Sequence, residues 1–390
     1  MLGHIAVDRA ADKLPFMRLF HRRTTLLTAT ASAAALLSAI AGPAAAAPVG
    51  TSTTASISVS DIADDANWVL QGQLPDGAIA WYVDKSHISP YLANYAAIGL
   101  AEARKQTGSR VYSAAAWSWL HWYAGHQDSN GFVTDYNVDA SGVETSTGDE
   151  DSTDAYAGTY LSALRAAYAV DPDWSQLSSL HPSIAAAVGA IEATQDTDGL
   201  TFAKPSWPVK YLMDQAETYD GLVSADELAG ALGDRVLAHR SQTDAAAMKT
   251  GIASLWDAPT GGYDWAKSGG VTTTDWTQLY PDAMEQAWIA GSPAISTTRA
   301  RQLVNTLEQA QPLWDSPTAT ANVNGGAGTV GYWAVAGWGL LRVGQTGPAL
   351  AAADSIRTAA LDANRDWPFT TGDAGELIVL ESGDTSLTTP

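Results

Sequence analysis

The stretch TQDTDGLTF (194–202) occurs in the chain in four related versions, and their spacing predicts the fold. Each version has polar turn residues, then glycine, then an apolar or aromatic residue, and each follows a segment with helical periodicity. The glycines of the four versions, Gly77, Gly131, Gly199 and Gly262, are 54, 68 and 63 residues apart. A period of this length, with a helix, a loop and a second helix in each unit, indicates repeated helical hairpins. The other three versions are QLPDGAI (73–79), HQDSNGFV (126–133) and DAPTGGYDW (257–265).

Helical periodicity extends outward from these loops over most of the chain. Patterns rich in Ala and Leu predict about twelve helices, which make six hairpins. The clearest strand-like segment is GGYDWAKSGGVTTTDW (261–276), which predicts a β-hairpin. The predicted helices lie near residues 61–73, 88–106, 110–126, 152–169, 181–194, 209–230, 233–256, 279–290, 296–310, 329–344, 347–363 and 373–382.

Small residues are concentrated in every second helix of this series. Examples are SPYLANYAAIGLAEA (89–103) and GYWAVAGWGLLRV (331–343). Ala and Gly allow helices to approach closely, as helices packed on both sides must, so we expect these helices to form an inner ring. The sequence therefore predicts an all-α fold, an (α/α)6 barrel of six helical hairpins. The six loops that enter the inner helices then open at one mouth and carry short β-hairpins.

The composition limits the partners that the protein can have. The 390 residues include no Cys and carry a formal net charge of −21. Residues 1–47 hold five of the 21 bases and two of the 42 acids, which leaves 16 bases, 40 acids and a net charge of −24 for the remainder. Such a surface repels nucleic acid and anionic membranes, so we expect neither as a partner. Without disulfides, stability must come from a large core.

The N-terminal segment has the three parts of a secretory signal. MRLFHRR (17–23) is basic, TTLLTATASAAALLSAIAG (24–42) is apolar, and PAAAAP (43–48) offers a cleavage site of small residues near Ala47. Ser and Thr interrupt the apolar part, and no later segment has about 20 apolar residues, so we expect no membrane anchor after signal removal.

These features predict the domain organisation. Residues 1–47 form the secretory signal peptide, residues 48–60 a flexible leader and residues 61–385 the barrel. The protein is then secreted to the extracellular side. The paired Arg22 and Arg23 suggest export by the twin-arginine route.

Three motifs at the entrances of predicted inner helices are similar to those of a known superfamily. QLPDGAI (73–79), WPVKYLMDQAE (207–217) and YPDAMEQAW (280–288) resemble stretches of the six-hairpin glycosidases, and the resemblance covers roughly residues 60–385. That superfamily includes glucoamylases, unsaturated glucuronyl hydrolases and cellobiose epimerases. The resemblance implies an (α/α)6 barrel that acts on carbohydrate.

Acids recur at the start of the predicted inner helices. Asp154, Asp214 and Asp282 each lie near the first turn of such a helix, and Glu217 and Glu285 follow the last two acids by three residues. A glycosidase needs one carboxylic acid to protonate the leaving oxygen and one carboxylate to activate water or attack carbon. We therefore predict that two of the three aspartates catalyse glycoside cleavage. The alternative is that they cap helices, because acids stabilise helix N-termini.

Aromatic and polar residues of the same loops are predicted to bind the sugar. Tryptophan rings stack on sugar rings, and Trp81, Trp207, Trp265 and Trp333 lie in or beside the mouth loops. Lys85 and Lys210 could pair with a substrate carboxylate or form internal salt bridges, and Lys210 could also pair with Asp214. Asp76 could bind a sugar or only shape its turn. The further predicted substrate-binding residues are His87, Tyr211, Glu217 and Tyr280.

Metal and cofactor motifs are weak. QDTDG and HQDSNG look like fragments of a calcium loop but lack its remaining ligands, and GDEDSTD (148–154) is an acidic run that could hold Ca²⁺. We predict no metal site and no cofactor. Three other functions stay open at this point: a carbohydrate-binding barrel without catalysis, a polysaccharide lyase that uses Lys85, Lys210 or the mouth histidines, and a sugar epimerase.

Overall fold

The computed structural model describes residues 57–388. The predicted signal peptide and residues 48–56 of the predicted leader lie outside the described residues. The first described helix, α2 (Val59–Gln71), begins directly after Ser58. Ser58 and Asp61 form a capping box, in which each side chain accepts a hydrogen bond from the backbone N–H group of the other residue. Together they satisfy two N–H groups that have no partner within the helix.

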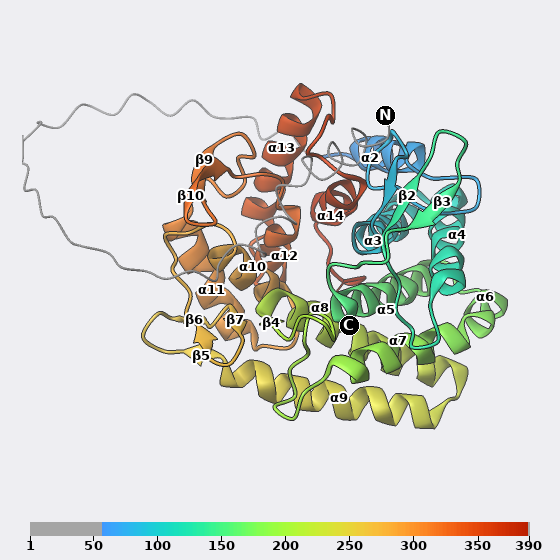
Figure 1. Cartoon of the computed structure of the whole chain (residues 1–390). Helices are drawn as coiled ribbons and strands as arrows, with labels where there is room; N and C mark the ends of the chain where they lie inside the picture. The colour runs from blue at the N-terminus through green and yellow to red at the C-terminus, as the bar shows by residue number, and fades with distance from the viewer. Residues whose placement is uncertain (1–56, 389–390) are drawn as a thin grey trace, which may run out of the picture. The chain divides into compact units, whose positions relative to one another are not determined.

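Twelve helices of residues 57–388 form two concentric rings (Figure 1). Each inner helix packs against the next, and the last inner helix packs against the first, which closes the ring. Each outer helix packs against one or both of the inner helices beside it. The predicted (α/α)6 barrel is therefore confirmed. The inner helices are α3 (Pro90–Thr107), α5 (Thr153–Val170), α8 (Leu212–Leu232), α10 (Asp282–Gly291), α12 (Ala334–Arg342) and α14 (Thr371–Ser382). The outer helices are α2, α4 (Arg110–His126), α7 (His181–Thr194), α9 (Arg235–Ser254), α11 (Thr297–Ala310) and α13 (Thr346–Asp362), and a short extra helix, α6 (Trp174–Ser179), was not predicted.

Glycines let the inner helices touch at two crossings. Gly99 of α3 faces Gly375 of α14, and Gly158 of α5 faces Gly221 of α8. A Cβ atom on Gly158 would lie 2.7 Å from the carbonyl oxygen of Glu217, which is closer than real Cβ atoms come. The small residues of the inner helices are therefore required by backbone contact. The first of these crossings joins the C-terminal hairpin to the N-terminal one, and Figure 1 shows α14 beside α2 and α3.

The repeated turn docks three outer helices. Gly77, Gly131 and Gly199 have φ values of 103°, 84° and 84°, and a Cβ atom at each would overlap a backbone carbonyl of the following outer helix, α4, α7 or α9. The fourth version differs from the other three. The left-handed residue there is Gly261 (φ 69°) and not Gly262, because this loop continues into a strand at Gly262.

Short antiparallel strands occur in the loops that enter inner helices. The predicted hairpin at 261–276 forms between β7 and β8, and the hairpins β2–β3 and β9–β10 also lie in mouth loops, where short hairpins were predicted without assigned positions. The strands are β1 (His87–Ile88), β2 (Tyr136–Val138), β3 (Glu144–Ser146), β4 (Lys210–Tyr211), β5 (Trp256–Asp257), β6 (Gly262–Tyr263), β7 (Ala266–Lys267), β8 (Val271–Thr272), β9 (Thr320–Val323) and β10 (Gly326–Thr329). They form sheets in the orders β1-β2-β3, β4-β7-β8, β5-β6 and β10-β9.

Contacts between these entry loops show that they gather at one mouth. Strand pairs join the first loop to the second (β1–β2) and the third to the fourth (β4–β7). The Leu279 amide in the fourth loop donates to the carbonyl oxygen of Asn322 in the fifth at 2.8 Å. The Thr371 amide, at the end of the sixth loop, donates to the carbonyl oxygen of Trp81 in the first at 2.9 Å. These contacts link the sixth, first and second loops to one another, and likewise the third, fourth and fifth, around the amino ends of the inner helices.

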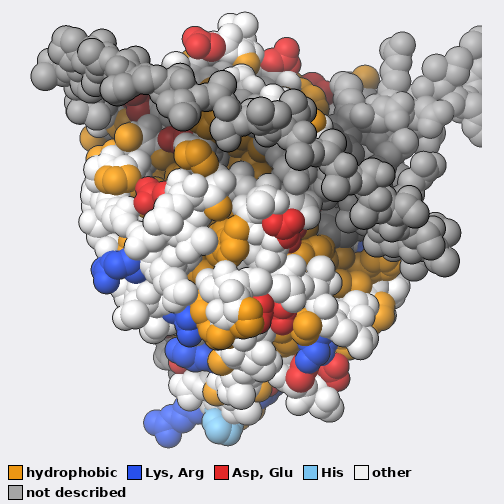
Figure 2. Space-filling view, turned by 90° about the vertical axis from the view of Figure 1, so that its left-hand side faces the viewer, with side chains coloured by type: hydrophobic (Ala, Val, Ile, Leu, Met, Phe, Trp, Pro, Cys, Tyr) orange, Lys and Arg blue, Asp and Glu red, His pale blue; other side chains and the backbone are white. Residues whose placement is uncertain are grey.

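The surface of residues 57–388 gives two further observations. None of their helices combines the length and apolar character needed to cross a bilayer. On the face drawn in Figure 2, the Lys and Arg side chains of the described residues are scattered among acidic and uncharged ones and form no continuous stripe. A basic stripe is the usual mark of a nucleic-acid-binding surface.

Candidate active site

The amino ends of three consecutive inner helices hold the predicted catalytic acids. Asp154 lies in the first turn of α5, Asp214 in that of α8 and Asp282 in that of α10. Their exposed fractions are 0, 4 and 3%. Because α5, α8 and α10 are neighbours in the inner ring, the three acids lie on one side of the mouth.

Asp214 combines a high pKa with an incomplete set of hydrogen bonds. Its Oδ2 lies 3.1 Å from Ser152 Oγ, and within residues 57–388 the carboxyl group makes no other hydrogen bond. Burial raises the pKa of Asp214 well above its usual value, and repulsion from Asp154, Glu217 and Glu285 raises it further. These surroundings favour the neutral form of the Asp214 carboxyl group over the charged form, which suits a group that donates a proton.

Asp154 is enclosed by its partners. Its Oδ1 accepts hydrogen bonds from Ser152 Oγ at 2.6 Å and from the Ala155 amide at 2.8 Å. Its Oδ2 accepts one from Thr201 Oγ1 at 2.6 Å. Burial raises the pKa of Asp154 to about 7, although these hydrogen bonds act in the opposite direction. A carboxyl group without exposed surface cannot touch a sugar in this conformation, so its contacts link the start of α5 to the turn before α8.

The two acids of α10 bind neighbouring backbone. Asp282 Oδ1 accepts a hydrogen bond from the Asp275 amide at 2.7 Å, and Glu285 Oε2 accepts one from the Met213 amide at the start of α8. Burial raises the pKa of Glu285 well above its usual value, and Glu217 adds repulsion. Glu285 therefore holds the amino end of α8, which carries Asp214, against α10.

Glu217 lies deeper in the barrel and is held by donors from two other inner helices, α3 and α10, which lie on opposite sides of the ring. Its Oε1 accepts hydrogen bonds from Tyr91 Oη at 2.6 Å, from Tyr95 Oη and from Trp288 Nε1 at 2.9 Å. Its Oε2 is buried and has no hydrogen-bond partner. Burial raises the pKa of Glu217 to about 7, although the three donors lower it. Glu217 also lines a small pocket of about 40 Å³, which is large enough for roughly one to three water molecules.

Asp151 was not predicted and is the exposed acid of this group. It precedes α5 within the acidic run GDEDSTD. The side chain is exposed, yet the protein atoms crowded around it reduce its hydration and raise the pKa to about 6, and Asp135 adds repulsion. The charge of Asp151 acts on Asp214, Tyr211 and Tyr280, which places it over the same part of the mouth. The acidic run was the available sequence signal, but it also suggested calcium binding.

Two predicted tryptophans form an aromatic group with Tyr211. Trp207 Nε1 donates to Tyr211 Oη at 3.1 Å, and the rings of Tyr211 and Trp265 stack at 6.2 Å between centroids. Trp207 and Trp265 are both partly exposed. Tyr211 directly precedes α8 and Asp214, so this group offers a stacking surface beside the candidate acid.

The other predicted aromatic residues pack against further rings. Trp333 stacks on Tyr280 at 5.3 Å with an interplanar angle of 20° and meets Trp288 edge to face. Trp81 lies 4.1 Å from the His87 ring and 5.3 Å from the Trp367 ring. Trp81, Trp333 and Tyr280 are buried at 6, 6 and 4% exposure.

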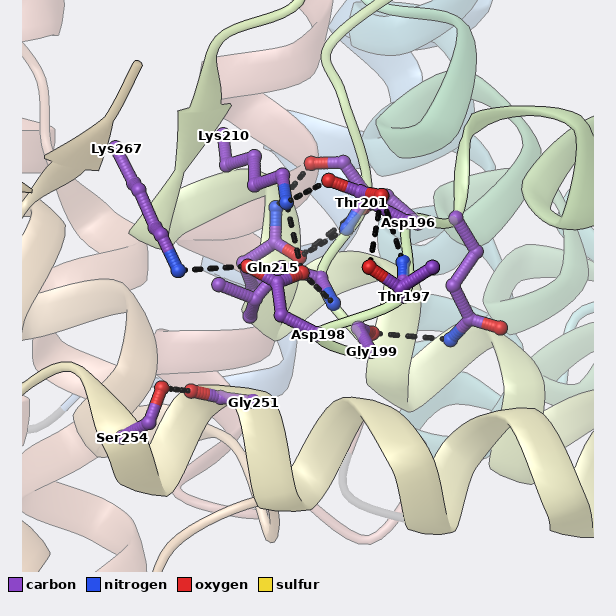
Figure 3. Close-up of polar contacts among 12 residues, drawn as sticks. Asp196, Thr197, Asp198, Gly199, Thr201, Lys210, Gln215, Gly251, Ser254 and Lys267 are labelled. Atoms are coloured by element: carbon purple, nitrogen blue, oxygen red, sulfur yellow. Dashed lines mark hydrogen bonds and ion pairs between the residues drawn. The ribbon is translucent and has the colours of Figure 1, made fainter. Parts of the chain in front are cut away.

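Lys210 belongs to an ion cluster (Figure 3). Its Nζ donates to Asp196 Oδ2 and Asp198 Oδ1, each at 2.7 Å, and Lys267 Nζ binds Asp198 Oδ2 at 2.7 Å. Burial alone would raise the pKa of Asp198, but the two lysines and a backbone amide lower it to about 2. Of the alternatives for Lys210, the structure therefore shows an internal salt bridge. The ammonium groups of Lys210 and Lys267 bind the carboxylates of the QDTDG stretch that looked like part of a calcium loop.

The remaining predicted binding residues also have partners within the chain. Lys85 Nζ donates to the Gln73 carbonyl at 2.7 Å, and Asp76 Oδ1 accepts from the Ala78 amide at 3.2 Å. His87 Nε2 lies 3.4 Å from Asp135 Oδ2. Lys85 and Asp76 thus shape the first turn, and His87 joins the first entry loop to the second. Within residues 57–388, no group of three or more His, Asp or Glu side chains is arranged to hold a metal ion.

Comparisons with known proteins identify the fold. No family model matches the chain, and no curated protein matches it. Solved structures do match over most of the barrel, each at 14% identity or less.

Three of the matching structures carry a specific enzyme name. A mannosylglycerate hydrolase of Thermus thermophilus in complex with glucose matches with a TM-score of 0.58 at 13% identity, over 82% of this chain and 98% of that one. A rhamnosidase of Klebsiella oxytoca with rhamnose bound matches with a TM-score of 0.60 at 14% identity, over 84% and 64%. A β-1,3-1,4-glucanase of a Paenibacillus species matches with a TM-score of 0.58 at 12% identity, over 84% and 93%. The chain thus has the (α/α)6 fold of the six-hairpin glycosidases, as its sequence predicted. Identities this low show the fold alone.

Proposed function

We propose that this chain is a secreted glycoside hydrolase that cleaves a neutral oligosaccharide or polysaccharide. The observation that carries the proposal is the pair formed by Asp214 and Asp151 at the mouth. Asp214 is buried with a pKa well above the usual value, and Asp151 is exposed with a pKa of about 6. Two nearby carboxyl groups whose environments hold one protonated and the other ionised are the requirement for acid and base roles.

In the proposed reaction, Asp214 is the general acid. Its proton passes to the glycosidic oxygen as the bond from that oxygen to the anomeric carbon breaks. The ionised Asp151 carboxylate then activates a water molecule or attacks the anomeric carbon. Trp207 and Trp265 would stack on the sugar beside Asp214. Of the three neighbours named above, two hold glucose or rhamnose and the third is a glucanase, which supports the substrate class by analogy only.

The charge distribution also favours a neutral substrate over an anionic one. Lys85 and Lys210, the lysines predicted to face a substrate carboxylate, are engaged within the chain. A polysaccharide lyase needs a cation to neutralise a uronate, so this arrangement counts against the lyase alternative. The acids at the mouth would in addition repel a uronate.

The experiment compares the wild type, Asp214→Asn and Asp151→Asn on a panel of neutral and uronate-containing oligosaccharides, with products separated by chromatography. We expect cleavage of a neutral member by the wild type and a loss of kcat of at least about 100-fold in each variant, the usual contribution of a general acid or base. Circular dichroism should show that both variants stay folded. Wild-type activity in Asp214→Asn would remove Asp214 from the site, and binding of a sugar without turnover by the wild type would indicate a carbohydrate-binding protein.

Export is the second part of the proposal. The basic and apolar segments at residues 17–42 and the small residues before Pro48 support it. Expression of the full chain in a bacterial host should release a mature protein whose sequenced N-terminus lies near residue 48. Retention of the full-length chain in the cytoplasm would contradict export. Replacing Arg22 and Arg23 by Lys should block export only if the twin-arginine route is used.

A further inference from the structure

Ser152 lies between two buried carboxyl groups. Its Oγ is 2.6 Å from Asp154 Oδ1 and 3.1 Å from Asp214 Oδ2. It is also the N-cap of α5 and lies 3.4 Å from the Ala155 amide, and its exposed fraction is 6%. The hydroxyl group therefore touches both a fully enclosed acid and the candidate general acid.

The number of hydrogen atoms in this contact restricts its protonation. A serine hydroxyl has one hydrogen and can donate to only one of the two carboxyl groups. If both acids were ionised, the second would face an oxygen lone pair without a hydrogen between them. One additional proton on either acid completes the chain of hydrogen bonds, so this geometry favours a state in which the two acids share a single proton.

The other contacts show which acid carries that proton. Asp154 has two further donors, the Ala155 amide at 2.8 Å and Thr201 Oγ1 at 2.6 Å. Hydrogen bonds from donors stabilise a carboxylate. Asp214 has no such donors among residues 57–388 and faces Asp151, Glu217 and Glu285, which are all acids. The extra proton therefore belongs on Asp214, and the Ser152 hydrogen points to Asp154.

We propose that Ser152 and Asp154 are positioning residues that keep the transferable proton on Asp214. The proton arrangement rests on the contacts above, and its use in catalysis rests on the proposed function. When the Asp214 proton passes to the glycosidic oxygen and the bond to carbon breaks, the Ser152 hydroxyl can rotate and donate to the new Asp214 carboxylate. The water that completes hydrolysis supplies the proton that restores Asp214.

The test compares Ser152→Ala and Ser152→Thr with the wild type. Loss of the hydroxyl group removes a hydrogen-bond donor from Asp154 and so raises the pKa of Asp154. A protonated Asp154 carries no charge and therefore opposes the ionisation of Asp214 less. The pKa of Asp214 then falls. We expect kcat of Ser152→Ala to drop by about tenfold or more with a small change in KM, and the alkaline limb of its pH profile to move to lower pH. Ser152→Thr, which keeps a hydroxyl group, should restore both.

The matched control is Ser296→Ala. Ser296 caps the outer helix α11 through the Arg299 amide, away from the inner-ring acids, so this variant loses an N-cap without touching Asp214. It should leave the pH profile unchanged. If Ser152→Ala merely loses stability, as Ser296→Ala does, and its alkaline limb does not move, the inference is overturned.

A second measurement keeps the inference independent of the proposed activity. Titration of the aspartate side-chain carboxyl carbons by ¹³C NMR should show a carboxyl group that stays protonated at neutral pH, is absent in Asp214→Asn and titrates at lower pH in Ser152→Ala and Asp154→Asn. This result without any glycoside cleavage would reject the proposed function and retain the proton arrangement. Titration of Asp214 at the same pH in the wild type, Ser152→Ala and Asp154→Asn would reject the arrangement.

Discussion

The environment of each acid, rather than its position along the helix, distinguishes the acids of α8. Asp214 and Glu217 are three residues apart on one helix, yet Glu217 is held by three donors while Asp214 meets a single hydroxyl group. Donors stabilise a carboxylate in place, whereas a carboxyl group without them retains its proton and can pass it on. Glu217 therefore suits a structural or substrate-orienting role, and Asp214 suits proton transfer.

A prediction at this scale concerns Glu217→Gln. The pKa of Glu217 in the folded state is about 7, above the value of about 4.3 in an unfolded chain. The stability that this group contributes is therefore complete below about pH 4 and is lost as the pH rises through about 7. Glutamine cannot ionise, so the melting temperature of Glu217→Gln should fall less than that of the wild type between pH 5 and pH 8, as calorimetry would measure. An unchanged slope would mean that Glu217 does not titrate in this range.

At the scale of elements, the ion cluster holds the strand that leads into α8. Lys210 of β4 lies opposite Lys267 of β7 in the sheet. The ammonium groups of both lysines bind the carboxylate of Asp198 in the repeated turn. Gln215 of α8 binds the same turn through the Thr201 amide at 2.8 Å. Lys210, four residues before Asp214, thus lies where the turn, the sheet and the amino end of α8 are held together.

We predict that Lys210→Met lowers the free energy of unfolding by roughly 1–3 kcal/mol, less than for a fully buried pair because its partners are partly exposed. Urea denaturation would measure the change. Lys267→Met is the matched control. Because Lys267 makes one ion pair and is 35% exposed, its loss should cost less than about 1 kcal/mol. Equal effects of the two substitutions would contradict the role assigned to Lys210.

A second prediction for elements concerns the crossing of α5 and α8. A Cβ atom on Gly158 meets the α8 backbone at Glu217 and Thr218, at 2.7 and 2.8 Å. Gly158→Ala should therefore force these helices apart and destabilise the protein by about 1–3 kcal/mol or more. Gly189 in the outer helix α7 has open space around its position, so Gly189→Ala should be neutral or stabilising by up to about 1 kcal/mol. Similar values for both would mean that α5 and α8 do not need glycine to cross.

At the scale of the whole molecule, a ring has to be closed between the two ends of the chain. The contact of α14 with α3 closes the inner ring, and Arg357 of α13 pairs with Asp61, Asp64 and Asp65 of α2 in the outer one. These partners are nearly 300 residues apart in sequence, so closing the ring depends on contacts between the two ends of the described chain. Contacts this distant in sequence generally slow folding.

The acids of the barrel predict how the stability of the whole protein depends on pH. Burial raises the folded-state pKa values of Asp154 and Glu217 to about 7 and that of Asp220 to about 8. Values above those of the unfolded chain mean that stability is highest at low pH and declines as the pH rises through about 7 to 8. The net negative charge adds repulsion in the same direction.

We therefore expect the melting temperature to be higher at pH 5 than at pH 8.5. The pKa of Asp198 is lowered to about 2, so its ionised form stabilises the folded protein, and this contribution is lost only as the pH falls below about 4. Scanning calorimetry at constant ionic strength would measure the profile. A melting temperature that rises from pH 5 to pH 8.5 would show that the buried acids are ionised in the folded protein.

The sequence by itself determined the architecture. Helical periodicity, small residues in every second helix and the repeated turn gave six hairpins and separated inner from outer helices, because these patterns record which faces of a helix are buried and how closely it packs. The short helix α6 was missed, and the positions of the hairpins β2–β3 and β9–β10 within the mouth loops were not predicted, because segments of a few residues carry little periodic signal.

Only the tertiary structure decided what each candidate residue touches. The sequence placed Asp154 and Asp214 in equivalent positions, and it could not show that Thr201 encloses the first or that Ser152 joins the two. It likewise left Lys210 between a substrate and an internal salt bridge, and Asp151 unrecognised within an acidic run. Protonation and pairing depend on burial and on partners that are tens to hundreds of residues away, and these exist only when the ring has closed.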